Sequence, residues 1–222
     1  MHLIIFDIDG TLIHTHAHEG DCFAQALFEI TGITDIERGM EAYEHVTDEG
    51  IARQCIRTRL DREATQHELD LIEQRFCEIL SDSLINRPPQ PIKGAQALLQ
   101  YLSEKPDTAL AIATGSYAHS ACLKLRHSDF AMESIDSLPM GSCNDHYQRV
   151  VLMQAALEKA KKLYNTSHFD SIIYVGDGPW DAKAVQTLGW GFIGVASHLS
   201  KAALLSLGAQ AVVENYLEHP FF

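Results

Sequence analysis

The sequence lacks any long apolar segment, any recognisable leader and any paired-cysteine motif. Its longest apolar runs, such as residues 3–6 and 109–113, fall far short of the roughly 18 residues that a membrane-spanning helix needs. Met1 and His2 precede the first run without the basic stretch that opens a signal peptide. The five cysteines are scattered and form no CxxC pair, which is typical of reduced thiols. We therefore expect a cytoplasmic protein without a membrane partner.

Positive charge is scarce, because 17 Lys and Arg residues stand against 30 Asp and Glu residues, for a net charge of -13 at pH 7. Such a surplus of negative charge repels phosphate backbones, so we expect no nucleic-acid partner. A small phosphorylated metabolite is not excluded, because its site needs only a local positive field. The 222 residues are 46% hydrophobic and 21% charged, which is enough apolar material for a sizeable core and excludes disorder for most of the chain.

The hydrophobic pattern predicts one strand, then a long helical segment, then an alternation of helices and strands. Residues 3–6 form an unbroken apolar run, as in buried parallel strands. Residues 19–82 show helical spacing of their apolar positions, with breaks expected near Gly32, Gly39 and Gly50. The helices expected after this segment are 94–104, 117–127 and 147–163, and the strands are 108–113, 171–175, 192–195 and 211–213.

Strands that alternate with helices indicate a parallel, doubly wound sheet. We therefore predict an α/β fold whose Rossmann-like core consists of residues 1–14 and 89–222. An all-helical cap domain, residues 15–88, is predicted to be inserted after the first strand. The proline-rich stretch at residues 88–91 marks its exit.

Three expected strands end in residues that can perform chemistry. The first is followed by the segment from Asp7 to Thr11, the second by Thr114 to Ser116, and the third by Gly176-Asp177 with Asp181 one turn further on. Because the carboxyl ends of parallel strands share one sheet edge, the carboxylates of Asp7, Asp9, Asp177 and Asp181 should converge. Their mutual repulsion predicts a divalent cation, and an all-oxygen site favours Mg²⁺. Asp177 would complete that site, and Asp181 would orient it or bind the metal's waters.

The placement of these residues predicts their roles. Asp7 caps its strand and is a candidate nucleophile. Asp9 lies two residues on, where it can protonate a leaving group and later deprotonate water. Gly10 allows a sharp turn beside the substrate. The hydroxyl and N–H groups of Thr114, Gly115 and Ser116 stand before a helix, where a phosphate can be seated.

These motifs resemble those of the haloacid dehalogenase superfamily of phosphotransferases. The segment Asp7-Ile8-Asp9-Gly10-Thr11-Leu12 resembles its first motif, Thr114 its second, and Gly176-Asp177 through Asp181 its fourth. The resemblance covers nearly the whole chain, because the helical insertion falls where that superfamily carries its small helical cap. Within the superfamily the chain looks like the phosphoglycolate-phosphatase-like group, whose caps often carry a segment similar to residues 46–51.

The resemblance implies a set of site residues. Asp7 would be phosphorylated, Asp9 would be the acid/base, and Mg²⁺ would be held by the Asp7 side chain, the Asp9 carbonyl and Asp177. The family places a Lys or Arg as its third motif, and this sequence has no Lys-Pro signature there. Arg149 is the best match and His146 the alternative. The cap segment contributes Thr47 and Asp48 as expected substrate-binding residues.

The predicted function is a magnesium-dependent phosphatase of small phosphate monoesters that works through an aspartyl-phosphate. Two alternatives stay open: a sugar-phosphate mutase with the same core residues, and a binding module with a vestigial site. His14, His16 and His18 would share one face of an extended chain, so that metal binding, substrate contact and a purely structural role are all open for them. The sequence points to no particular substrate or oligomeric state.

Overall fold

A single parallel sheet forms the core of the described chain. The structure is a computed structural model that describes residues 1–14, 17–130, 135 and 137–217. Within these residues the sheet has six strands in the order β3-β2-β1-β4-β5-β6, and every pair is parallel. The strands are β1 (His2–Phe6), β2 (Thr108–Ala113), β3 (Met140–Gly141), β4 (Ser171–Gly176), β5 (Gly191–Val195) and β6 (Ala211–Val213). The predicted doubly wound α/β fold is thus confirmed.

Strand β1 is buried on both faces, which explains its unbroken apolar run. Leu3 and Ile5 point into one hydrophobic cluster, and Ile4 and Phe6 into the other. The strand lies between β2 and β4, with Phe6 opposite Ile112 and Val175. The chain segments that leave these three strands at their carboxyl ends are therefore neighbours at the middle of one sheet edge.

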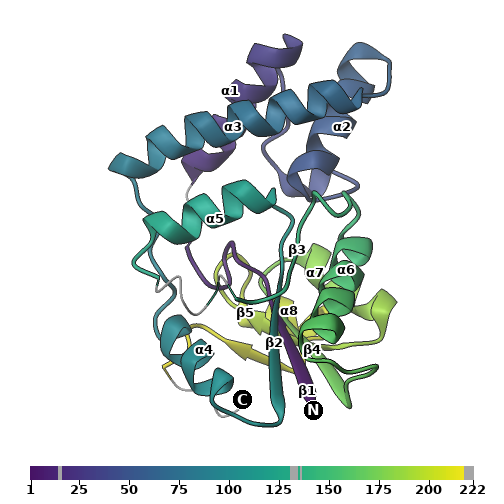
Figure 1. The fold of residues 1–222 in the computed structure, drawn as a ribbon. Helices are drawn as coiled ribbons and strands as arrows, with labels where there is room; N and C mark the ends of the chain where they lie inside the picture. Colours follow the sequence, from purple (N-terminus) through teal and green to yellow (C-terminus); the bar gives the residue numbers. More distant parts are fainter. Residues whose placement is uncertain (15–16, 131–134, 136, 218–222) are drawn as a thin grey trace.

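Two layers of helices cover the sheet (Figure 1). One face packs against α4 (Ala95–Ser103) and α5 (Ala118–His127), and the other against α6 (Arg149–Leu163), α7 (Pro179–Leu188) and α8 (Lys201–Ser206). The predicted helices agree with α4, α5 and α6 to within two residues at each end. The pattern did not predict β3, because its two residues are too few to show any periodicity.

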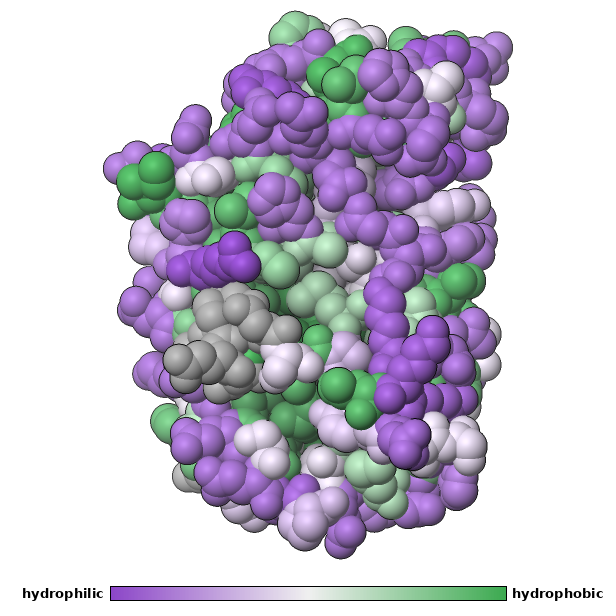
Figure 2. Space-filling model, viewed as in Figure 1, coloured by the Kyte–Doolittle hydropathy of each residue, from purple (hydrophilic) through white to green (hydrophobic). Residues whose placement is uncertain are grey.

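Between β1 and α4 the chain forms α1 (Ala17–Thr31), the short 3-10 helix η1 (Met40–Ala42), α2 (Asp48–Leu60) and α3 (Gln66–Asn86), here called the helical insert. It lies over the carboxyl ends of the central strands, with α3 above α5 (Figure 1). Its helices enclose a third hydrophobic cluster, which includes Phe23, Ile56 and Phe76. Hydrophilic residues cover most of its outer face in the view of Figure 2. None of the described helices is long and apolar enough to cross a membrane.

The insert corrects two details of the helical prediction. Residues 32–39 contain no regular helix, although helical spacing was expected across them. Gly50 does not interrupt a helix, because it lies in the first turn of α2, where its N–H donates to the Thr47 hydroxyl at 3.1 Å. A Cβ at Gly50 would come within 2.7 Å of the His45 carbonyl oxygen, so the glycine serves close packing rather than a break. The domain boundaries at 15 and 88 stay a prediction.

Candidate active site

Three buried carboxylates meet at the carboxyl edge of the central strands. Asp7 follows β1, Asp177 follows β4, and Asp181 lies in the first turn of α7. One carboxylate oxygen from each lies within 4.8 Å of the other two, and all three side chains are buried. Gly10 permits this approach: its φ is +69°, and a Cβ there would lie 2.0 Å from Asp177 Oδ2. The sequence prediction that these strand ends converge therefore holds for Asp7, Asp177 and Asp181.

Arg149 lies beside these carboxylates, at the start of α6 and buried. Its Nη1 donates to Asp181 Oδ1 at 2.7 Å and lies 3.4 Å from Asp7 Oδ2. Its Nη2 donates to the Val46 carbonyl oxygen of the insert at 3.1 Å. His146 instead stacks on Tyr147, with ring centroids 4.7 Å apart. Of the two candidates for the third motif, Arg149 is the one that the fold places at Asp7.

Burial of this cluster changes the protonation of its acids. Burial raises the pKa of Asp7 well above its ordinary value; Arg149 opposes this rise, and the charges of Asp181 and Asp177 add to it. Burial likewise raises the pKa of Asp181 to about 6, with Arg149 again opposing. Arg149 provides one permanent positive charge against three buried carboxylates, and His198, whose Nδ1 lies 2.5 Å from Asp177 Oδ2, adds a second only when its ring is protonated. The cluster therefore favours the binding of further positive charge.

The donor set fits a divalent cation of the Mg²⁺ type, because every available ligand atom is oxygen. Asp181 is the weakest of the predicted ligands, because Oδ1 accepts from Arg149 and Oδ2 accepts from the backbone N–H groups of Asp177 and Gly178 at 3.2 and 3.0 Å. These bonds fit the orienting role that the sequence also suggested for it. Asp177 Oδ2 accepts a hydrogen bond from the Ser197 hydroxyl at 3.0 Å and lies 2.5 Å from His198 Nδ1, and these two contacts fix its side chain.

Asp9 lies on the α5 side of the site. Its Oδ2 accepts a hydrogen bond from the Ser116 hydroxyl at 2.9 Å and forms an ion pair with Lys124. Thr114 lies at the end of β2, where its hydroxyl accepts from the Ser116 N–H at 3.1 Å. The predicted phosphate seat, Thr114 to Ser116, is therefore adjacent to the predicted acid/base.

Sequence reasoning missed Lys124. This side chain is buried in α5, and its Nζ contacts Asp9, Ser116 and Glu19. A signal was present, because Lys124 follows Ala121 by three residues and therefore shares the apolar face of that helix. A lysine at such a position needs a buried anionic partner.

Thr47 and Asp48, the predicted cap contributions, lie at the junction of the insert with the core. The Thr47 hydroxyl donates to the Tyr147 carbonyl oxygen at 2.7 Å. The Asp48 N–H donates to the Gly115 carbonyl oxygen at 2.8 Å, and Asp48 Oδ2 accepts from the Tyr117 N–H at 3.0 Å. In this arrangement their polar atoms hold the insert against the core. Substrate contact by either residue stays a prediction.

His14 and His18 do not lie on one extended segment. His14 is exposed, whereas His18 is buried within α1, so the extended geometry does not continue through it. His16 lies outside the described residues.

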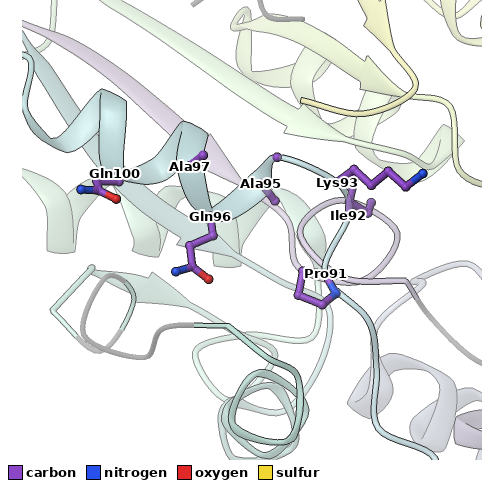
Figure 3. Close-up of a pocket in the computed structure, with 8 residues that line it drawn as sticks. Pro91, Ile92, Lys93, Ala95, Gln96, Ala97 and Gln100 are labelled. Atoms are coloured by element: carbon purple, nitrogen blue, oxygen red, sulfur yellow. The ribbon is translucent and has the colours of Figure 1, made fainter. Parts of the chain in front are cut away.

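Two hollows on the described surface lie away from the carboxylates. A cavity of about 350 Å³ opens at the start of α4, where Pro91, Lys93, Gln96 and Gln100 are among its lining residues (Figure 3). A second, of about 620 Å³, lies between α3 and α5 and includes Glu73 in its lining. Beside the carboxylates, residues 46–48 of the insert instead contact Tyr147, Arg149 and Gly115 of the core. The structure therefore shows the insert closed on the core.

The parallel sheet and the acidic site at its carboxyl edge define a Rossmann-like α/β protein. The family model for haloacid dehalogenase-like hydrolases matches residues 1–189, and the chain belongs to that family. No functionally curated relative matches the chain significantly.

Several solved structures share the fold. A hydrolase from Pseudomonas syringae is 18% identical, with a TM-score of 0.72, and the match covers 97% of this chain and 94% of that one. A haloacid dehalogenase hydrolase of family IA, variant 3, from Entamoeba histolytica is 20% identical, with a TM-score of 0.71 and the same coverage. CbbY from Rhodobacter sphaeroides, solved in complex with phosphate, is 15% identical, with a TM-score of 0.63, and the match covers 98% and 96% of the two chains.

Proposed function

We propose that this protein is a magnesium-dependent phosphatase that hydrolyses small phosphate monoesters. The observation that carries the proposal is the buried cluster of Asp7, Asp177 and Asp181, which Arg149 partly neutralises. Such a cluster can hold a divalent cation and receive a phosphate dianion beside a carboxylate nucleophile. The phosphate complex of CbbY supports phosphate as the recognised group.

In the proposed reaction, an Asp7 carboxylate oxygen attacks phosphorus and the bond from phosphorus to the ester oxygen breaks. Asp9 gives its proton to that leaving oxygen and thus releases an alcohol. The Asp9 carboxylate then takes a proton from water, whose oxygen attacks phosphorus and restores free Asp7 and inorganic phosphate. Arg149 stabilises the charge on the phosphoryl oxygens through its planar fork.

Mg²⁺ would be held by the Asp7 side chain, Asp177 and the Asp9 carbonyl, and would neutralise charge on the phosphoryl group. The Thr114 hydroxyl would donate to a phosphoryl oxygen at the end of β2, whereas Ser116 donates to Asp9 Oδ2 and to the Thr114 hydroxyl oxygen and so supports the phosphate seat. The closed insert would exclude bulk water and admit only compact substrates, which agrees with the expectation of a small phosphorylated metabolite. The negative net charge of the chain favours such a substrate over a nucleic acid.

The test is the release of inorganic phosphate from a panel of sugar, glycerol and aryl phosphates, with and without Mg²⁺. We expect turnover with Mg²⁺ and a loss of several orders of magnitude in Asp7→Asn, because an amide does not attack phosphorus. Circular dichroism provides the control that this variant is folded. The proposal fails if the panel yields no phosphate or if Asp7→Asn retains the wild-type rate. Isomerised sugar phosphate without net phosphate release would indicate the mutase instead.

A further inference from the structure

We propose that Lys124 is a positioning residue that holds Asp9 for proton transfer and ties it to α1 through Glu19. Proton transfer to the leaving group would then depend on the insert lying against the core. The inference rests on the proposed function, because it takes Asp9 as the acid/base of phosphate ester hydrolysis.

The contacts of Lys124 join three parts of the chain. Its Nζ pairs with Asp9 Oδ2, donates to the Ser116 hydroxyl at 3.0 Å and lies 3.3 Å from Glu19 Oε2. Asp9 follows β1, Ser116 follows β2, and Glu19 lies in the first turn of α1. Lys124 and Asp9 are 115 positions apart in the sequence. One ammonium group thus connects the acid/base, the phosphate seat and the insert.

The residues that make this connection are buried, which makes the loss of any one contact costly. The side chain of Lys124 is only 3% exposed and that of Glu19 9%. Lys124 pairs there with the carboxylates of Asp9 and Glu19. A buried charge that loses its partners is strongly destabilising. Lys124 accordingly fixes the positions of the carboxylates around it.

The geometry leaves one oxygen of Asp9 available. Ser116 and Lys124 both bind Oδ2. Oδ1 is buried and has no hydrogen-bond partner among the described residues. An unpartnered buried carboxylate oxygen is costly unless something else binds it, and a leaving-group oxygen or an attacking water would be that partner. By anchoring Oδ2, Lys124 therefore presents Oδ1 for the transferred proton.

Glu19 adds the link to the insert. It belongs to α1, which begins shortly after the loop that carries Asp7 and Asp9, whereas Lys124 belongs to the core helix α5. Moving α1 away from α5 would separate Glu19 from Lys124 and loosen the anchor on Asp9. The acid/base would then be ordered only when the insert covers the site.

The test compares two substrates whose leaving groups differ in their need for a proton. Proton donation matters greatly for an alkyl phosphate, whose alkoxide leaves poorly, and little for p-nitrophenyl phosphate, whose phenolate is stable without a proton. We expect Lys124→Met to lower kcat/KM, which covers only the steps up to leaving-group departure, by roughly 10- to 100-fold on glycerol phosphate and by less than about threefold on p-nitrophenyl phosphate. In an Asp9→Asn background the same substitution should change kcat/KM by less than about twofold, because residues that act as a unit are not additive.

Two further variants test the inference in case Lys124→Met does not fold. Lys124→Met combined with Glu19→Gln removes a buried cation together with one of its anions and should show the same dependence on the leaving group. Lys124→Arg keeps the charge and should recover part of the lost rate. Lys159 is an exposed lysine of α6 that pairs with Asp145, so Lys159→Met is the matched control and should leave both rates unchanged.

Equal losses in kcat/KM on both esters in every folded Lys124 variant would overturn the inference and leave the proposed function standing, since the lysine would then be only structural. Full additivity of Lys124→Met with Asp9→Asn would overturn it as well. If the wild-type protein releases phosphate from neither ester, the proposed function itself has failed.

Discussion

Arg149 offers the sharpest test of the site, because it is the cation that the fold places next to the predicted nucleophile. Its Nη1 donates a hydrogen bond to Asp181 at 2.7 Å and lies 3.4 Å from Asp7. Its Nη2 donates to the Val46 carbonyl oxygen at 3.1 Å. Arg149→Ala removes these contacts at once. Arg149→Lys keeps the charge but loses the fork that binds two partners.

The expected magnitude follows from these contacts. A hydrogen bond to a charged group contributes about 1.5–3 kcal/mol, which corresponds to a loss of roughly 10- to 150-fold in kcat/KM for Arg149→Ala. Removing one partner of a buried ion pair also costs about 3–5 kcal/mol of stability, because Asp7 and Asp181 are left without their cation. We expect Arg149→Lys to recover part of both losses. His146→Ala should change kcat/KM by less than about threefold, because its ring contacts Tyr147 rather than Asp7.

The assay is kcat/KM for phosphate release with Mg²⁺, measured well below the Tm of each variant, with Tm taken from thermal unfolding. This separation matters because a partly unfolded sample would imitate a catalytic defect. Wild-type activity in a folded Arg149→Ala variant would refute the role of Arg149. A larger loss in His146→Ala than in Arg149→Ala would transfer that role to His146.

Three further outcomes are expected. Excess chelator should abolish phosphate release and Mg²⁺ restore it, with Ca²⁺ a poor substitute because it prefers longer bonds and more ligands; full activity in chelator would contradict this. Burial raises the pKa of Asp48 to about 7, so the folded state holds a proton that the unfolded state releases near its own pKa of about 4. Stability should therefore fall as pH rises from about 4 to 7, and urea unfolding of Asp48→Asn should show a smaller dependence. In Gly115→Ala the new Cβ would meet Arg149 Nη2 at 2.5 Å and the Val46 carbonyl oxygen at 2.9 Å, so activity should drop while far-UV circular dichroism is retained.

The local sequence was sufficient where one property of the chain dominates. The buried strand β1 shows as an unbroken apolar run because both of its faces are covered. The carboxylates that follow β1 and β4 could be brought together from topology alone, because parallel strands end at a common edge. The expectation that Asp7 and Asp177 are neighbours needed no coordinates.

The beginnings and ends of the helices in the helical insert were harder to predict from the sequence. Gly50 indicated a break in the sequence pattern. In the structure a glycine is needed there because His45 packs too close to leave room for a Cβ. The sequence alone does not distinguish a glycine that permits close packing from a glycine that ends a helix.

Lys124 and Arg149 mark the limit of what the sequence by itself determined. Both lie near the apolar faces of helices, where periodicity indicates burial but does not name a partner. Lys124 pairs with Asp9 and Glu19, which come from segments far away in the chain. Arg149 likewise contacts the distant Asp7 and Val46. The sequence determined the strands, the acidic edge and the family motifs, because these depend on local pattern and on topology. Only the tertiary structure decided which buried cation faces which carboxylate, because a charge in a core is stabilised by whatever the packed helices bring within a few ångströms of it.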